Sequence, residues 1–171
     1  MKKKIINILF VTSFIFYVSF LIWNILFKYV SPMELFSSSR YFYRNINLIP
    51  FNDIINKNYN QLDIWGNVIL FIPLGIYIKT FFKNSNMLKN IIILCGISLI
   101  FEVSQYVFAI GATDITDIIT NTIGGILGIN IYLLLKRLLK EDKKIKNFIS
   151  ICSTIVMIIV GGIVIMLLMN S

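Results

Sequence analysis

An acidic residue in the middle of an apolar run is the first candidate for chemistry in this sequence. Glu102 lies eight residues before the end of its run at Ile110, roughly 12 Å along a helix. Ser98 and Gln105 lie on the same stripe of that helix, which should face protein. A carboxyl group inside a membrane must be protonated or paired with a cation or a hydrogen-bond donor. Two interpretations stay open: a hydrogen-bond clamp between helices, or a functional carboxylate in a cavity.

A second polar group opens the next apolar run. Positions 114, 117, 121, 124 and 128 advance by three and four residues, so they share one helix face. Gly124 and Gly128 form a close-packing motif that should turn this face toward a neighbouring helix. Asp117 and Asn121 would then point inward, where a binding role and a packing role both stay open. Asp114 fits the N-cap of this helix, which is a structural role.

Membrane helices must position these residues. The chain has 171 residues, 57% of them hydrophobic, and a mean hydropathy of +0.82, which excludes an ordinary soluble domain. Five runs are long enough to cross a hydrocarbon core of about 30 Å, at about 5–27, 64–82, 88–110, 118–135 and 148–169. We therefore predict an all-α membrane protein, a polytopic bundle of about five transmembrane helices. Its membrane domain is expected at 1–140, and 141–171 as a cytoplasmic basic linker and the fifth transmembrane helix.

The basic residues predict the orientation. The net charge is +8, and Lys and Arg near the ends of membrane spans tend to stay cytoplasmic. A cytoplasmic N-terminus places twelve of the 16 basic residues inside and four outside. Residues 28–63 then form an outer interfacial loop, and Asn67, near the start of the second span, joins Gln105, Asp117 and Asn121 in the outer half, with Glu102 at its floor. The basic run at 136–146 lies beneath two spans, which favours contact with membrane lipid and argues against nucleic acid.

Several kinds of chemistry are excluded or disfavoured. The chain has no histidine, so neither a histidine-based catalytic triad nor a histidine metal site can form. Cys95 and Cys152 lie in apolar runs and form no Cys-x-x-Cys pair. We expect no metal site and no cofactor. Arg40 and Arg44 in the outer loop are candidates for contact with an anion or lipid phosphate, or they anchor the loop at the interface.

Four short motifs resemble one known family. They occur in the family's order between Asn47 and Gly128, and they are Asn47-Leu-Ile-Pro-Phe51, Gly66-Asn-Val-Ile-Leu-Phe-Ile-Pro-Leu-Gly75, Glu102-x-x-Gln105, and Asp114-Ile-Thr-Asp117 leading into Asn121-Thr-Ile-Gly-Gly125. Together they resemble the VanZ-like family of small bacterial membrane proteins. The resemblance implies a multi-pass protein of the bacterial cytoplasmic membrane, from a family whose namesake is associated with resistance to the glycopeptide teicoplanin. It also implies that the characteristic polar residues fall on Asn67, Glu102, Gln105, Asp114, Asp117 and Asn121.

Two positions depart from the family pattern. Many members have a basic residue just before the Asp-Ile pair and an acid at the position of Thr116. Here Ala112 and Thr113 precede Asp114, and Thr116 is neutral. If that charge cluster defines the role in resistance, this chain has another role.

Three hypotheses for function follow. The first is an envelope protein, not itself an enzyme, whose outer-facing polar pocket engages a membrane lipid, a lipid-linked cell-wall precursor or a lipoglycopeptide. The second is an intramembrane enzyme acting on a lipid-linked precursor, with Glu102 and Asp117 as general acid and base or as ligands of a divalent cation. The third is a small proton-coupled transporter or flippase that uses Glu102 and works as a homo-oligomer. The sequence favours the first, because it has no histidine, no cysteine poised for nucleophilic attack and no glycine-rich phosphate-binding loop.

Overall fold

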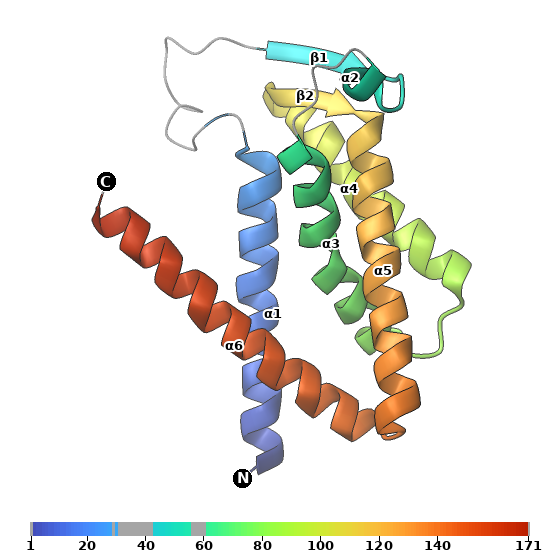
Figure 1. The fold of residues 1–171 in the computed structure, drawn as a ribbon, viewed down its shortest axis with the longest axis vertical. Coiled ribbons are helices and arrows are strands. Elements are labelled where there is room, and N and C mark those ends of the chain that lie inside the picture. Colours follow the sequence, from blue (N-terminus) through green and yellow to red (C-terminus); the bar gives the residue numbers. More distant parts are fainter. Residues whose placement is uncertain (1, 29, 31–42, 56–60, 171) are drawn as a thin grey trace. The chain divides into compact units, whose positions relative to one another are not determined.

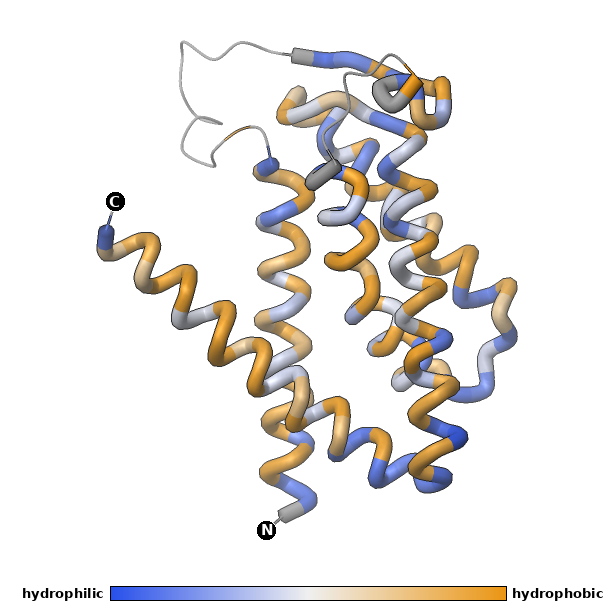
Figure 2. Tube along the Cα trace, in the orientation of Figure 1, coloured by the Kyte–Doolittle hydropathy of each residue, from blue (hydrophilic) through white to orange (hydrophobic). Residues whose placement is uncertain are grey.

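The computed structural model describes residues 2–28, 30, 43–55 and 61–170. Five of its helices are long and apolar enough to cross a membrane, and they are α1 (Lys2–Leu26), α3 (Gln61–Phe81), α4 (Met87–Phe108), α5 (Ile115–Leu139) and α6 (Asp142–Met169). Their tubes are predominantly hydrophobic in Figure 2. These helices confirm the predicted all-α membrane fold with five spans.

Three short elements lie between the long helices. They are β1 (Tyr43–Asn47), α2 (Asn52–Ile55) and β2 (Ile110–Asp114). Strand β1 ends at Asn47, and Phe51 has a left-handed backbone with φ 57°. The span predicted to reach Ile110 ends at Phe108, because Ala109 takes a left-handed C-cap conformation and Ile110 begins β2.

The chain divides into two compact units, which are described separately. The first unit combines residues 1–21 with 133–171 and contains most of α1 and all of α6. Small polar residues join these two helices. The hydroxyls of Ser13 and Ser153 lie 2.8 Å apart, and Ser150 donates to the backbone carbonyl of Ile6 at 3.0 Å. Such hydrogen bonds are a usual way to hold helices together where the surroundings are apolar.

The second unit covers residues 22–132 and contains α3, α4 and the first part of α5. Glycines bring α3 and α5 into backbone contact. A Cβ atom added to Gly124 would lie 2.2 Å from the carbonyl oxygen of Val68, and one added to Gly128 would lie 1.9 Å from that of Ile72. The expected close packing of the Gly124–Gly128 face is therefore confirmed, and its partner is α3.

A two-stranded sheet lies across one end of α3, α4 and α5 in Figure 1. We call this end of the second unit the strand end. Strands β1 and β2 are parallel, and Tyr43 pairs with Ile110 while Asn47 pairs with Asp114. Strand β2 follows directly after α4 and leads directly into α5. The sheet therefore ties the segment before α3 to the turn between α4 and α5.

The division into 1–140 and 141–171 stays a prediction. It follows the expected membrane domain, whereas the two units reflect which helices pack together.

Candidate functional site

Glu102 connects α4 to the turn that follows it. Its side chain is 1% exposed, and its Oε2 atom accepts a hydrogen bond of 2.9 Å from the backbone N–H of Asp114. The Thr113 hydroxyl donates to the backbone carbonyl of Glu102 at 3.1 Å. The carboxyl group expected near the middle of the membrane therefore lies beneath β2, with one oxygen bound to the backbone.

Asp114 has the capping role that the sequence predicted. Its Oδ1 atom accepts from the backbone N–H of Thr116 at 2.7 Å, which satisfies a free N–H at the start of α5. Its Oδ2 atom accepts from Nδ2 of Asn47 at 3.0 Å, so the residue also holds the end of β1. Asn47 in turn accepts from the backbone N–H of Ile49 at 3.2 Å.

Thr116 makes a second link between α5 and the segment after β1. Its hydroxyl oxygen accepts from the backbone N–H of Phe51 at 3.0 Å. Sequence reasoning assigned no contact to Asn47 or Thr116. The signal that could have found them is their place inside two of the motifs, because polar residues in a motif at a turn commonly bond to the backbone.

The stripe of Ser98, Glu102 and Gln105 faces protein, as predicted. These side chains are 0%, 1% and 2% exposed. Nδ2 of Asn121 donates to the Ser98 hydroxyl at 2.9 Å, which links α5 to α4. Nε2 of Gln105 donates to the backbone carbonyl of Ile25 in the last turn of α1, at 2.9 Å. The expected interhelical clamp is therefore present, and it joins three helices.

Asp117 lies in a charged group that the sequence identified only in part. The Asn67 side chain lies beside the Asp117 carboxylate, and the charges of Lys28, Asp63 and Asp114 act on it. Lys28 binds Asp63 at 2.8 Å between Nζ and Oδ1. Lys28 and Asp63 were missed. The available signal was a pair of opposite charges at the end of the first apolar run and the start of the second.

The six predicted site residues therefore gather at or beneath the strand end, and they come from three helices and strand β2. We call these residues, Asn67, Glu102, Gln105, Asp114, Asp117 and Asn121, the polar cluster. Four of them are at least 96% buried, and Asp114 and Asp117 are partly exposed. Whether the cluster binds a ligand stays a prediction.

Four buried atoms of the polar cluster have no hydrogen-bond partner among the residues that the structure describes. They are Nδ2 of Asn67, Oε1 of Glu102, Oε1 of Gln105 and Oδ1 of Asn121. Buried polar atoms in folded proteins are nearly always bonded to protein or to ordered water. This arrangement gives the cluster unused capacity to bind a polar or charged group.

Arg44 lies at the strand end but is directed to the end of α4. Its Nη2 atom donates to the carbonyl of Val107 at 3.4 Å, and its guanidinium lies 5.6 Å from the centre of the Tyr106 ring. Arg44 belongs to strand β1. Arg40 lies outside the described residues, and contact of either arginine with an anion or lipid stays a prediction.

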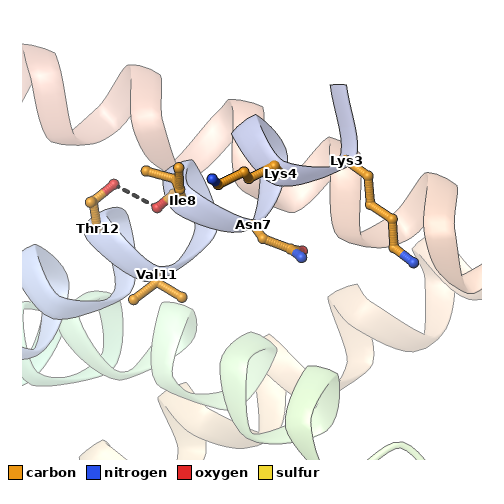
Figure 3. Close-up of a pocket in the computed structure, with 6 residues that line it drawn as sticks. All are labelled: Lys3, Lys4, Asn7, Ile8, Val11 and Thr12. Atoms are coloured by element: carbon orange, nitrogen blue, oxygen red, sulfur yellow. Dashed lines mark hydrogen bonds between the residues drawn. The ribbon is translucent and has the colours of Figure 1, made fainter. Parts of the chain in front are cut away.

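Two hollows have linings that include no residue of the polar cluster. One, of about 670 Å³, runs along the beginning of α1 and is drawn in Figure 3. Its lining is Lys3, Lys4, Asn7, Ile8, Val11 and Thr12. The other, of about 720 Å³, lies at the connection between α3 and α4 and is lined by residues 81–86 and Lys89. Both are lined in part by lysines, which suits contact with phosphate groups at a membrane surface.

Within the described ranges, no group of three or more acidic or cysteine side chains is placed to hold a metal ion.

Two comparisons of the sequence with known proteins found a match. The sequence model of the VanZ/LLP1 family matches residues 14–136, which include α3, α4 and the whole polar cluster. Protein VanZ of Enterococcus faecium is 40% identical over 127 residues, covering 74% of this chain and 75% of the relative. No solved structure matches the chain significantly. With five helices suited to a membrane and this similarity over most of its length, the chain is a membrane protein that belongs to the VanZ/LLP1 family.

Proposed function

We propose that this protein lies in the bacterial cytoplasmic membrane and lowers susceptibility to teicoplanin-type lipoglycopeptides through the polar cluster. The strand end faces outward, where teicoplanin's acyl tail would bring the antibiotic to the interface. The carboxylates and amides of the cluster suit an amine or sugar hydroxyls, and a lipid-linked wall precursor offers the same chemistry. The protein acts by binding and is not itself an enzyme.

The gathering of the polar cluster at one end of the second unit is the observation that carries this proposal. Asp114 and Asp117 remain partly exposed there, whereas Glu102 lies buried beneath them. A ligand arriving at the strand end therefore meets carboxylates first. Polar side chains within a membrane helix are costly, so four buried ones in a single cluster support a binding role.

The orientation rests on the basic residues. The α3–α4 connection carries Lys83, and the α5–α6 connection carries Lys140, with Lys136 and Arg137 in the last turn of α5. The α3–α4 connection lies at the opposite end of α3 and α4 from the strands in Figure 1, and the basic residues of α5 end the helix that β2 leads into. A cytoplasmic location for this basic end places the strand end outside.

A susceptibility assay tests the proposal. The chain is expressed in a sensitive Gram-positive host, and the minimal inhibitory concentrations of teicoplanin and vancomycin are measured against an empty vector. We expect protection against teicoplanin and little against vancomycin. Asp117→Ala and Glu102→Ala should each remove most of the protection, because each removes a carboxylate of the cluster.

The matched control is Glu141→Ala, which removes an exposed carboxylate paired with Lys144 in the α5–α6 connection. All variants must reach equal membrane levels on an immunoblot. Full protection by both cluster variants would show that the polar cluster is not the site. Absence of protection by the wild-type chain would reject the antibiotic and leave an envelope lipid or wall precursor as the ligand.

A further inference from the structure

Two buried oxygen atoms on α4, one of Glu102 and one of Gln105, have no hydrogen-bond partner among the described residues. Oε2 of Glu102 already accepts from Asp114, and its other oxygen, Oε1, has no partner. Nε2 of Gln105 donates to the carbonyl of Ile25, and a carbonyl oxygen only accepts. This bond fixes the orientation of the Gln105 amide, so its unpaired atom is an oxygen.

The two residues lie close together along the helix. Glu102 and Gln105 are three residues apart on one stripe, which corresponds to about 4.5 Å along the helix axis. Their side chains are 1% and 2% exposed, so bulk water does not reach them. Two acceptors cannot satisfy each other, and an unsatisfied buried acceptor is costly. When Glu102 is ionised, a positively charged or donating group is therefore missing beside them.

The facing helix α5 provides further oxygens. Asn121 is fully buried and held against Ser98, one turn from Glu102 on α4, and its Oδ1 atom also has no partner. The Asp117 carboxylate lies near enough for its charge to act on Glu102. Thus α4 and α5, which the Asn121–Ser98 bond joins, both carry buried oxygen atoms.

The charge of this region calls for a cation. The described strand end contains the carboxylates of Asp63, Glu102, Asp114 and Asp117. Lys28 is the cation whose charge acts on both Glu102 and Asp117, and its ammonium group binds Asp63 at 2.8 Å. A buried carboxylate is stable only when it is protonated, hydrogen-bonded or paired with positive charge.

We propose that Glu102, Gln105, Asp117 and Asn121 bind one monovalent metal cation, such as Na⁺, between α4 and α5. All four supply oxygen atoms, the ligand type that hard cations prefer. Asp114 is engaged in capping, and Lys28 already supplies one positive charge nearby. The carboxylates of Glu102 and Asp117 therefore suit a monovalent cation better than a divalent one. Mg²⁺ keeps several of its waters, which a site at this depth does not favour. The cation would neutralise Glu102 and lock the two helices together beneath the strand end.

A protonated Glu102 is the simplest competing account. A neutral carboxyl group can donate through its hydroxyl, for example to Gln105, and needs no cation. Glu102→Gln separates the two accounts, because glutamine keeps the shape and a donor but removes the charge. Under the competing account this variant behaves as the wild-type chain does, with no response to Na⁺ in either.

The first experiment measures thermal unfolding of the purified, detergent-solubilised chain. The salt is varied from choline chloride to NaCl at constant ionic strength. We expect the wild-type Tm to rise by roughly 5 °C in NaCl and to reach a plateau as the site saturates. Glu102→Gln should lose this rise, and Glu141→Gln, an exposed carboxylate changed in the same way, should keep it. A wild-type Tm that does not respond to Na⁺ would overturn the proposal, as would a full response in Glu102→Gln.

The second experiment keeps the test valid if Glu102→Gln does not fold. Equilibrium binding of radioactive sodium to the wild-type chain should reach about one ion per chain and be displaced by unlabelled NaCl but not by choline. Asn121→Ala should weaken the binding at least tenfold. Displacement by micromolar Mg²⁺ or Ca²⁺ would identify a divalent site and reject the monovalent one.

The cation site goes beyond the proposed function and is tested separately from it. Sodium binding by a chain that gives no protection against teicoplanin would reject only the antibiotic role. Protection without sodium binding would reject only the cation.

Discussion

At the scale of single residues, Asp114 makes contacts at the strand end beyond its capping of α5. Its backbone N–H binds Glu102 in α4, its Oδ1 caps α5, and its Oδ2 holds Asn47 in β1. A single residue thus connects two helices and a strand. The capping role follows from local spacing and could be predicted, whereas the contact with Asn47 joins residues 67 positions apart and could not.

This convergence predicts coupling between Asn47 and Asp114. Asn47→Ala should lower the free energy of unfolding by about 1 kcal/mol. Asp114→Ala should lower it by more, because it also removes the cap. The double variant should lose less unfolding free energy than the two single variants added together, by roughly 0.5–1 kcal/mol. Denaturant unfolding in detergent micelles measures all three. Strictly additive losses would mean that the hydrogen bond between the side chains contributes nothing.

At the scale of elements, the glycine contacts between α3 and α5 set the geometry of the polar cluster. Gly124 and Gly128 lie on the same face of α5 as Asp117 and Asn121. Gly75 makes the reciprocal approach from α3, because an added Cβ would lie 1.9 Å from the carbonyl oxygen of Gly125. This close approach brings Asn67 on α3 to the side of Asp117.

A methyl group on this face should separate the helices. In Gly128→Ala the new Cβ would meet the carbonyl oxygen of Ile72 at 1.9 Å, and a backbone atom can yield only if α3 moves. We expect this variant to lose several °C of Tm or to fail to fold. Gly96→Ala in α4 is the control, because nothing lies within 4 Å of its added Cβ, and alanine favours a helix over glycine. Fluorescence-detected size exclusion after a heat series compares the two. Equal stability of both variants would contradict the contact.

The elements also show what the sequence could and could not predict. The five helices follow from runs of apolar residues, a local property that survives in the structure. The predicted inward stripe of Ser98, Glu102 and Gln105 and the glycine face follow from helical spacing, which is equally local. The strands could not be predicted from local sequence, because β2 has only five residues and acquires its structure by pairing with β1. Lys28 and Asp63 were missed for the same reason, since their contact joins the ends of two separate helices.

At the scale of the whole molecule, the expected orientation predicts which positions are accessible from outside the cell. Leu48 just after β1 is 71% exposed, and Asn170 follows α6. In a background with Cys95 and Cys152 replaced by alanine, Leu48→Cys and Asn170→Cys should react with a membrane-impermeant maleimide on intact cells. Lys83→Cys in the α3–α4 connection should react only after the cells are opened. The reverse pattern would place the polar cluster on the cytoplasmic side.

The parallel pairing of β1 with β2 also sets an order of events during synthesis. Asn47 leaves the ribosome 67 residues before its partner Asp114, and two membrane helices, α3 and α4, lie between them. At the usual 5–20 residues per second, β1 waits about 3–13 s before β2 exists. During that time its backbone groups are unpaired, and the first strand must remain soluble beside the membrane. Its sequence Tyr-Arg-Asn-Ile-Asn, with one charge and two asparagines in five residues, suits a strand that has to wait.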